Sequence, residues 1–203
     1  MSIGASSLAS PTLAGLFWPS KDDVRFAALR AVVLAVVGSA LLTLSAKVQV
    51  PFYPVPMTMQ TLVVLVIGAT YGSRLGVATV ALYLAQGAAG LPVFANTPPL
   101  PAGLGYFAGP TGGFLLGFLA SALVMGVMAE KGWDRSLARV IVMMTIGHAV
   151  IFAFGLGWLS MWMPVLKAWA VGAAPFIAAT VVKTALAVAL MQAGWTVARR
   201  SAR

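Results

Sequence analysis

A single lysine lies deep inside an otherwise apolar run of the sequence. Lys183 occurs in the segment ATVVKTALAVAL, which carries no other charge. If this segment crosses a membrane, burying the ammonium costs about 2.5–3.5 kcal/mol, so the side chain needs a partner inside the protein. The four acidic residues all lie outside the apolar runs: Asp22, Asp23, Glu130 and Asp134. We therefore expect Lys183 to meet backbone carbonyls or a ligand that carries a carboxylate or carbonyl oxygen.

Few other polar side chains are placed where they could bind a ligand. Thr58 ends the proline-rich stretch VQVPFYPVPMT, Gln60 follows it at the start of an apolar run, and Asn96 lies in a later loop. His148 is the one histidine of the chain and has no carboxylate near it in sequence. We expect it to be a hydrogen-bonded core histidine rather than a metal ligand.

The residue sets that most catalytic mechanisms need are missing from the sequence. There is no cysteine, no Ser–His–acid combination, no acidic metal cluster and no GxxxxGK[ST] loop. The stretch GPTGG at 109–113 is rich in glycine but has no lysine for a phosphate. We expect a protein that binds and moves a small molecule and is not an enzyme, with no metal and no cofactor. If ATP powers this movement, another chain must hydrolyse it.

The composition places these residues in a membrane. Hydrophobic residues make up 61% of the 203 residues and charged residues only 8%, against about 25% charged in typical soluble domains. A soluble globule of this size cannot hide so much apolar surface, so lipid must surround the chain. The net charge of +9 then reflects membrane topology, and we expect no nucleic-acid partner.

Six apolar runs predict an all-α integral membrane bundle of six transmembrane helices. Of the 13 Lys and Arg residues, ten fall on the side that holds both termini, Lys47 and Lys167 fall on the other, and Lys183 lies in a span. The positive-inside rule puts both termini in the cytoplasm, with the bundle in the plasma (inner) membrane. We expect a tail or interfacial segment over 1–24 and one transmembrane domain over 25–203. The predicted spans are 26–45, 60–71, 75–89, 112–129, 137–158 and 171–197.

Two loops on the outer side carry almost no charge. Residues 46–59 hold three prolines, which predict a stiff, extended, re-entrant strap rather than a helix. Such a strap is either a rigid outer turn or the wall of a cavity. Residues 90–113 contain Phe94, Tyr106 and Phe107 among many Gly and Pro. An uncharged aromatic loop beside the strap favours a lid over a small amphipathic ligand.

Small residues recur every four positions in the first predicted span, at Ala27, Ala31 and Ala35. This spacing leaves a smooth strip that another helix can approach closely. The strip is explained either by packing inside the bundle or by docking of a partner membrane protein.

Three motifs in order resemble the BioY family of biotin transport proteins. They are VPFYPVPMTMQTLVVLVIGATYGSRLG, ALYLAQGAAGLPVFA and GPTGGFLLGF, and the resemblance covers about residues 25–198. BioY proteins are the substrate-binding (S) components of energy-coupling-factor (ECF) vitamin transporters. The resemblance implies a six-helix S-component bundle that captures biotin from the outer side under closing loops. It also implies that Ala27, Ala31 and Ala35 dock the transmembrane coupling protein of a module with ATPase subunits.

The resemblance further implies which residues bind biotin. Family motifs include the proline strap and Tyr83, and the family often has an acid three residues before its helix-six lysine. Lys183 matches that lysine, but position 180 is Thr, so the usual acid–lysine arrangement does not carry over. Which polar group meets the ureido ring and which the carboxylate stays open. The expected site comprises Lys183, Thr180, Gln60, Thr58, Tyr83, Asn96, Tyr53 and Phe94.

Two other classes of function stay open at this stage. One is an S component for another vitamin, such as thiamine or riboflavin, or for a small membrane-permeating cofactor. The other is a membrane-embedded enzyme that acts on a lipid or isoprenoid, against which the lack of acidic residues in the spans argues. Whether the chain works alone or only with an energising module is also open.

Overall fold

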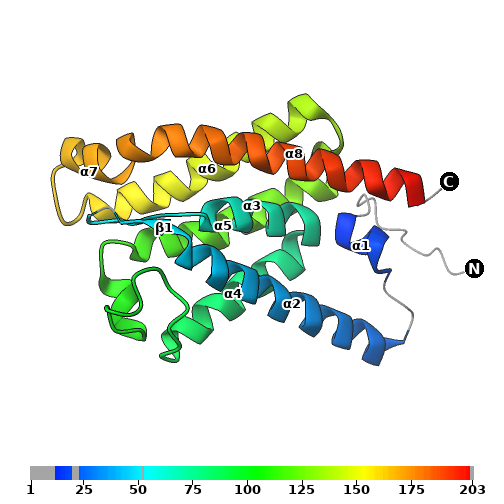
Figure 1. Cartoon of the computed structure of the whole chain (residues 1–203), viewed down its shortest axis with the longest axis horizontal. Helices are drawn as coiled ribbons and strands as arrows, with labels where there is room; N and C mark the ends of the chain where they lie inside the picture. The colour runs from blue at the N-terminus through cyan, green and yellow to red at the C-terminus, as the bar shows by residue number, and fades with distance from the viewer. Residues whose placement is uncertain (1–11, 20–22, 52, 202–203) are drawn as a thin grey trace, which may run out of the picture.

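The computed structural model describes residues 12–19, 23–51 and 53–201, and most of this chain is helical (Figure 1). The predicted all-helical class is confirmed. Three short 3₁₀ helices also occur, η1 (Leu104–Ala108), η2 (Trp133–Arg135) and η3 (Ala174–Phe176). The α-helices are α1 (Leu13–Phe17), α2 (Val24–Lys47), α3 (Gln60–Tyr71), α4 (Ser73–Ala88), α5 (Gly112–Glu130), α6 (Leu137–Leu159), α7 (Val165–Gly172) and α8 (Ile177–Ser201).

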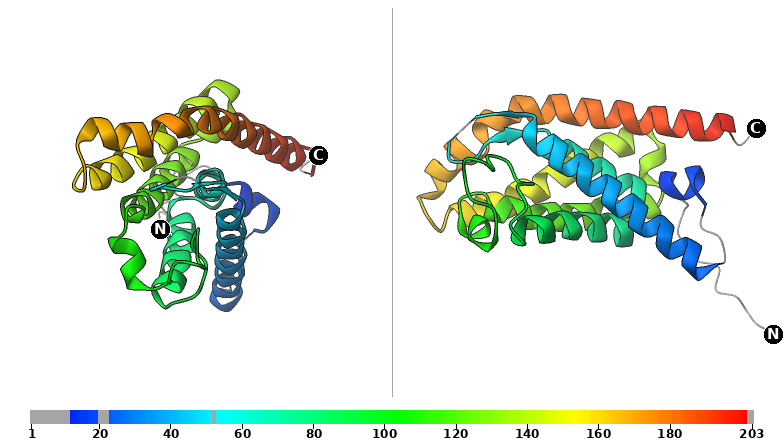
Figure 2. Two further views of the ribbon diagram at one scale, coloured as in Figure 1. Left: turned by 60° about the vertical axis from the view of Figure 1, so that its left-hand side comes forward. Right: turned by 60° about the horizontal axis from the view of Figure 1, so that its bottom comes forward.

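The long helices lie side by side and alternate in direction, so the connections gather at two ends (Figures 1 and 2). One end, here called the loop end, holds residues 48–59, residues 89–111 and α7. The other, the terminal end, holds α1 and the last turns of α8. Seen from two sides in Figure 2, α2 crosses the other long helices obliquely.

Four segments of the described chain are long and apolar enough to cross a membrane: Val24–Lys47, Gly112–Glu130, Leu137–Leu159 and Val165–Arg200. The 24 residues of α2 extend about 36 Å at 1.5 Å per residue, which exceeds the apolar core of a bilayer. The 12 residues of α3 fall short of it. The protein is therefore a multi-pass membrane protein that combines long apolar helices with shorter ones.

The last predicted span, 171–197, differs from the observed elements. The chain forms α7 and η3 before α8 begins at Ile177. Pro175 lies in η3 at one of its first two positions. Proline has no backbone N–H and fixes φ, so it starts a helix well but does not continue one. The apolar run that hydropathy reads as one span is broken there.

The predicted strap over 46–59 is a narrow hairpin rather than a single extended segment. Its two-residue strands β1 (Gln49–Val50) and β2 (Met57–Thr58) pair antiparallel, with Gln49 opposite Thr58. Val55 and Pro56 are buried against the bundle. The hairpin therefore packs on protein, as non-helical backbone at membrane depth must.

The turn between α3 and α4 brings two helices back to back at the terminal end. Gly72 adopts a φ of 83°, which a residue with a Cβ rarely does. Glu130, at the end of α5, accepts hydrogen bonds from the backbone N–H of Ser73 at 2.7 Å and from its hydroxyl at 2.8 Å. The carboxylate thus caps the start of α4 and ties it to α5, the helix that packs against α3, α4 and α6.

The described part of the predicted tail is a short helix held against the bundle. Leu13 of α1 is buried, and α1 packs against α3 and α8. The Arg30 guanidinium donates to the carbonyls of Trp18 at 2.5 Å and Ala14 at 2.8 Å, which fixes the end of α1. Residues 1–11 and 20–22 of the tail lie outside the described chain.

The small-residue strip on α2 is half-buried. Ala27, Ala31 and Ala35 continue the line of the buried Ser39 and Leu42 further along the helix. The more exposed face of α2 is a different one, made of larger apolar side chains: Leu29, Val32, Val33, Val36, Val37, Leu41 and Leu44. The strip therefore lies at the border between the buried face and the outward face of α2, and the large side chains face outward, as expected where lipid is the solvent.

Candidate ligand-binding site

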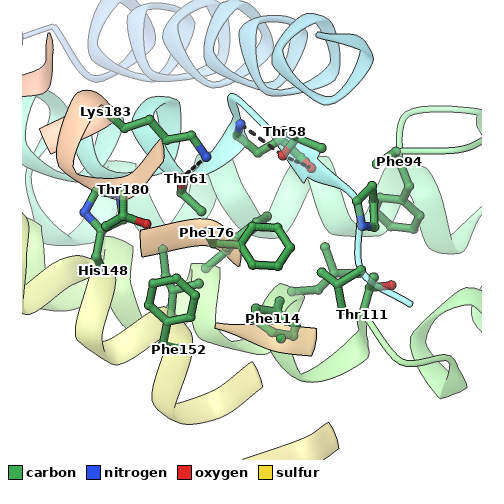
Figure 3. A pocket seen from close by; sticks show the side chains of 18 of the residues that line it. Thr58, Thr61, Phe94, Thr111, Phe114, His148, Phe152, Phe176, Thr180 and Lys183 are labelled. Carbon is green, nitrogen blue, oxygen red and sulfur yellow. Dashed lines mark hydrogen bonds between the residues drawn. The ribbon is translucent and has the colours of Figure 1, made fainter. Parts of the chain in front are cut away.

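A cavity opens among α3, α4, α5, α6 and α8 below the hairpin (Figure 3). Its atoms surround about 660 Å³ of empty space, a volume that includes the open space at the mouth. Most of the lining is apolar or aromatic, including Phe114, Phe152 and Phe176. A few polar groups are distributed over this apolar wall.

Lys183 lies at one end of the cavity with only 6% of its surface exposed. Its Nζ donates to the Thr61 hydroxyl at 3.3 Å, as Figure 3 shows. Within the described chain Thr61 is its one hydrogen-bond partner. An ammonium has three donors, so Lys183 retains donors for a ligand oxygen. Thr180 and His148 line the same end.

A chain of hydrogen bonds starts in α3, where Gln60 directly precedes Thr61, and runs to the loop after α4. The Thr58 hydroxyl contacts Gln60 Oε1 at 3.2 Å. The Gln60 amide donates to the Tyr83 hydroxyl at 2.6 Å, and that hydroxyl donates to the Val93 carbonyl at 3.1 Å. Because each donor in this chain has an acceptor, Gln60 and Tyr83 can be buried without the cost of unpaired polar groups.

Phe94 closes the cavity toward the loop end. Its ring is 1% exposed and packs edge-on against Tyr83 with centroids 5.5 Å apart. Tyr106 stacks on the same ring at 4.7 Å. The ring lies directly over Gly87, where a Cβ would overlap it. The predicted lid loop is therefore anchored by an aromatic side chain that requires glycine on α4.

Lys47 ties this loop to the end of α2. Its Nζ donates to the carbonyls of Phe94 at 2.8 Å and Thr97 at 2.5 Å. The Thr97 hydroxyl also donates to the Phe94 carbonyl, at 2.6 Å. Lys47 was not among the predicted site residues. The signal in the sequence is its position, since it is one of two lysines on the loop end and lies at the start of the predicted strap.

Six of the eight predicted ligand residues line this one cavity: Thr58, Gln60, Tyr83, Phe94, Thr180 and Lys183. Tyr53 does not, since it is 92% exposed at the tip of the hairpin. Asn96 lines an adjoining hollow with Pro54 and Pro101, which shares Tyr106 and Thr111 with the cavity. Its φ is 56°, a conformation that Asn tolerates better than most residues. The structure thus gives Asn96 a role in shaping the loop.

Other lining residues were missed from the sequence. Thr61 directly follows Gln60, and its hydroxyl within an apolar run was the available signal. Phe114, Phe152 and Phe176 carry no such signal, because an aromatic residue in a span reads the same whether it faces lipid or a cavity. Three-dimensional packing alone brings them to the site.

The site suits a small molecule with an apolar body and polar ends. One buried ammonium and a few hydroxyl and amide groups can fix such a molecule's orientation, while the aromatic wall excludes water. In the described residues no group of three or more His, Cys, Asp or Glu could hold a metal ion. Fold and cavity together define a multi-pass helical membrane protein with a cavity that suits a small amphipathic ligand.

The chain belongs to the BioY family. The model of that family matches residues 19–200, almost the whole sequence. The biotin transporter BioY of Thermotoga maritima is 35% identical over 160 residues, which cover 78% of this chain and 92% of that protein. The biotin transporter BioY of Rhizobium etli is 32% identical over 183 residues, covering 86% and 93%.

A solved structure supports the fold. The crystal structure of the S-component for biotin from an ECF-type ABC transporter superposes with a TM-score of 0.73. The match covers 85% of this chain and 93% of that one, at 21% sequence identity. The predicted likeness to S components is therefore confirmed at the level of the helical arrangement.

Proposed function

We propose that this protein is the biotin-binding component of a vitamin uptake system. It captures biotin from the outer side of the membrane and acts as a transport protein, not as an enzyme. The observation that carries the proposal is the buried Lys183, with donors to spare, in an apolar cavity. Relatives covering most of the chain are named biotin transporters, which supports biotin over other vitamins.

Biotin matches the chemistry of this cavity. It has an apolar bicyclic body, a ureido group that both donates and accepts hydrogen bonds, and a carboxylate on a flexible chain. Lys183 supplies a charge-assisted hydrogen bond to one of its oxygens, and Gln60 and Thr180 offer further polar contacts. The rings of Tyr83 and Phe94 pack on the apolar body.

The proposed topology has six membrane-crossing helices with both termini in the cytoplasm of the inner membrane. The short helices α3 and α4 are the second and third of these six. They can be short because the buried hairpin occupies part of the membrane thickness at the loop end. The basic residues support this orientation. Arg74, Lys131, Arg199 and Arg200 lie at the terminal end, which the positive-inside rule assigns to the cytoplasm.

Inward delivery is proposed to use an ECF partner module with a transmembrane coupling protein and ATPase subunits. The half-buried strip of Ala27, Ala31 and Ala35 offers a smooth surface where α2 lies obliquely to the bundle. A partner helix that packs on this strip would couple ATP hydrolysis in other chains to reorientation of the bundle.

A ligand panel tests the substrate. Equilibrium binding of radiolabelled biotin, thiamine and riboflavin to the detergent-purified chain should give saturable binding of biotin alone. Binding of a different vitamin would support the alternative S-component function and overturn the biotin assignment. Near-ultraviolet circular dichroism of the same sample establishes that the protein is folded.

A further inference from the structure

The single histidine has a defined hydrogen-bonding state. His148 Nδ1 lies 3.0 Å from the carbonyl oxygen of Met144, one turn earlier in α6. A carbonyl can only accept, so this short contact requires that Nδ1 carries the proton. The Thr184 hydroxyl, 3.3 Å from the same nitrogen, can then accept from it but cannot donate to it.

The other ring nitrogen is left as an acceptor. His148 lines the same cavity as Lys183, and a second cation in this apolar space would be repelled by the ammonium. The imidazole is therefore neutral, and Nε2 carries a lone pair. His148 is 3% exposed, and its Nε2 has no hydrogen-bond partner among the described residues.

An unpaired buried acceptor needs an explanation. Three other buried side-chain atoms of the described chain also lack partners, on Gln49, Asp134 and Gln192. None of these three residues lines the cavity. His148 does, beside Thr180 and Lys183 (Figure 3). His148 also borders a more open hollow on the outer side of α6 and α8, with Thr145 and Val181. Of the four unpaired atoms, its Nε2 is the one that belongs to a residue of the ligand cavity.

We propose that His148 Nε2 accepts a hydrogen bond from an N–H group of the transported molecule. The inference rests on the proposed function, and it adds a specificity-determining residue to the site. Lys183 can only donate, so it cannot bind an N–H group, whereas the neutral imidazole can. In biotin the N–H groups occur only in the ureido ring. The ureido ring therefore lies at the end of the cavity where α6 faces α8, and the carboxylate is directed away from His148.

Nitrogen NMR tests this contact directly, because a chain with one histidine gives one pair of ring signals. The protein, labelled with ¹⁵N-histidine and purified through a tag without histidine, should show Nδ1 protonated and Nε2 unprotonated. Saturation with biotin should shift the Nε2 signal toward that of a hydrogen-bonded acceptor and leave Nδ1 protonated. An Nε2 signal that is protonated at the start, or unchanged by bound biotin, would overturn the proposal.

Two substitutions separate the nitrogen positions. In His148→Asn the short amide can replace Nδ1 but leaves no polar atom near the position of Nε2. In His148→Gln the longer amide places an oxygen near Nε2. We expect about tenfold weaker biotin binding for the Asn variant, and a smaller loss for the Gln variant. Equal losses in two variants with unchanged melting temperatures would contradict the role of Nε2.

Biotin methyl ester shows which end of the ligand is involved. If Nε2 contacts the ureido ring, His148→Asn weakens binding of biotin and of its ester by the same factor. A loss confined to the free acid would mean that His148 contacts the carboxylate and would overturn the inference. Failure of the proposed function is a separate outcome, seen as the absence of biotin binding to the folded wild-type protein.

Discussion

The amide of Gln60 donates a hydrogen bond to the hydroxyl of Tyr83 over 2.6 Å. This contact joins the first residue of α3 to α4. The Tyr83 hydroxyl in turn donates a hydrogen bond to the Val93 carbonyl in the outer loop. One wall of the cavity and its lid are thereby fixed by a single buried chain of polar groups. Its loss should affect both stability and ligand binding.

Tyr83→Phe should lower the stability of the protein by about 1–3 kcal/mol, because the Gln60 amide and the Val93 carbonyl lose their partner in a buried site. Thermal unfolding in detergent measures this loss, and biotin affinity should fall with it. The matched control is Tyr106→Phe, which removes the hydroxyl that donates to the Ala95 carbonyl in the loop. A Tyr83→Phe protein as stable as wild type would show that the chain of hydrogen bonds contributes little.

Lys47→Met should speed biotin dissociation by roughly three- to tenfold, because the loop at 94–97 loses its charged tie to α2. Methionine keeps the length and apolar character of the stem, so the helix itself is not disturbed. Chase experiments with labelled biotin measure the rate. Lys167→Met, at the same end of the bundle, should leave the dissociation rate unchanged. Equal effects of both substitutions would mean that the loss of a positive charge at this end, and not the loss of the bonds from Lys47 to the loop, changes the rate.

Asp134→Asn should stabilise the protein at neutral pH. Burial raises the pKa of Asp134, although the Trp195 indole N–H donates to it at 3.0 Å. A carboxyl whose pKa is higher in the folded state costs stability as pH rises through the unfolded and then the folded pKa. Acidification removes that cost in the wild type.

The gain in melting temperature of Asp134→Asn should therefore be largest at neutral pH and shrink as the pH is lowered. Asp134→Ala is the control, since it also removes the acceptor for Trp195 and should not show the same gain. A difference between Asn variant and wild type that grows on acidification would contradict the direction of the pKa shift.

Ala31→Leu should weaken association with an ECF coupling protein without changing biotin affinity, because the larger side chain fills the smooth strip on α2. Co-purification with co-expressed ECF transmembrane and ATPase subunits measures the association. Ala28→Leu makes the same change on the exposed side of α2 and should have no effect. If Ala28→Leu alone disrupts the complex, the exposed face is the docking surface and the strip is not.

Much of the bundle could be predicted because a helix that lies in lipid must be apolar along its length. Long apolar stretches of the sequence therefore mark the membrane helices directly. The start and end of α3 at Gln60 and Tyr71 were predicted to the residue, since prolines precede it and Gly72 ends it. The break at Pro175 was missed because the apolar run continues across it. Hydropathy measures only how apolar a segment is, whereas a proline interrupts the helix through its backbone geometry without making the segment more polar.

The candidate site shows the same division. Lys183, Gln60 and Thr58 stood out as polar groups in apolar surroundings, and they line one cavity. Tyr53 and Asn96 were expected there from motif and loop position, but the direction of a side chain in an irregular loop depends on packing that a linear sequence does not encode. The acceptor state of His148 likewise depends on a contact with its own helix backbone.

The most direct test of the proposed function is the dissociation constant of biotin for the wild-type protein and for Lys183→Met, measured in detergent on samples with matched melting temperatures. Loss of a charge-assisted hydrogen bond in a buried site should weaken binding about 10- to 100-fold, and Thr61→Val, which removes only the partner of Lys183, should weaken it less. A Lys183→Met protein that is folded and binds biotin as tightly as wild type would contradict the assignment of this cavity as the biotin site.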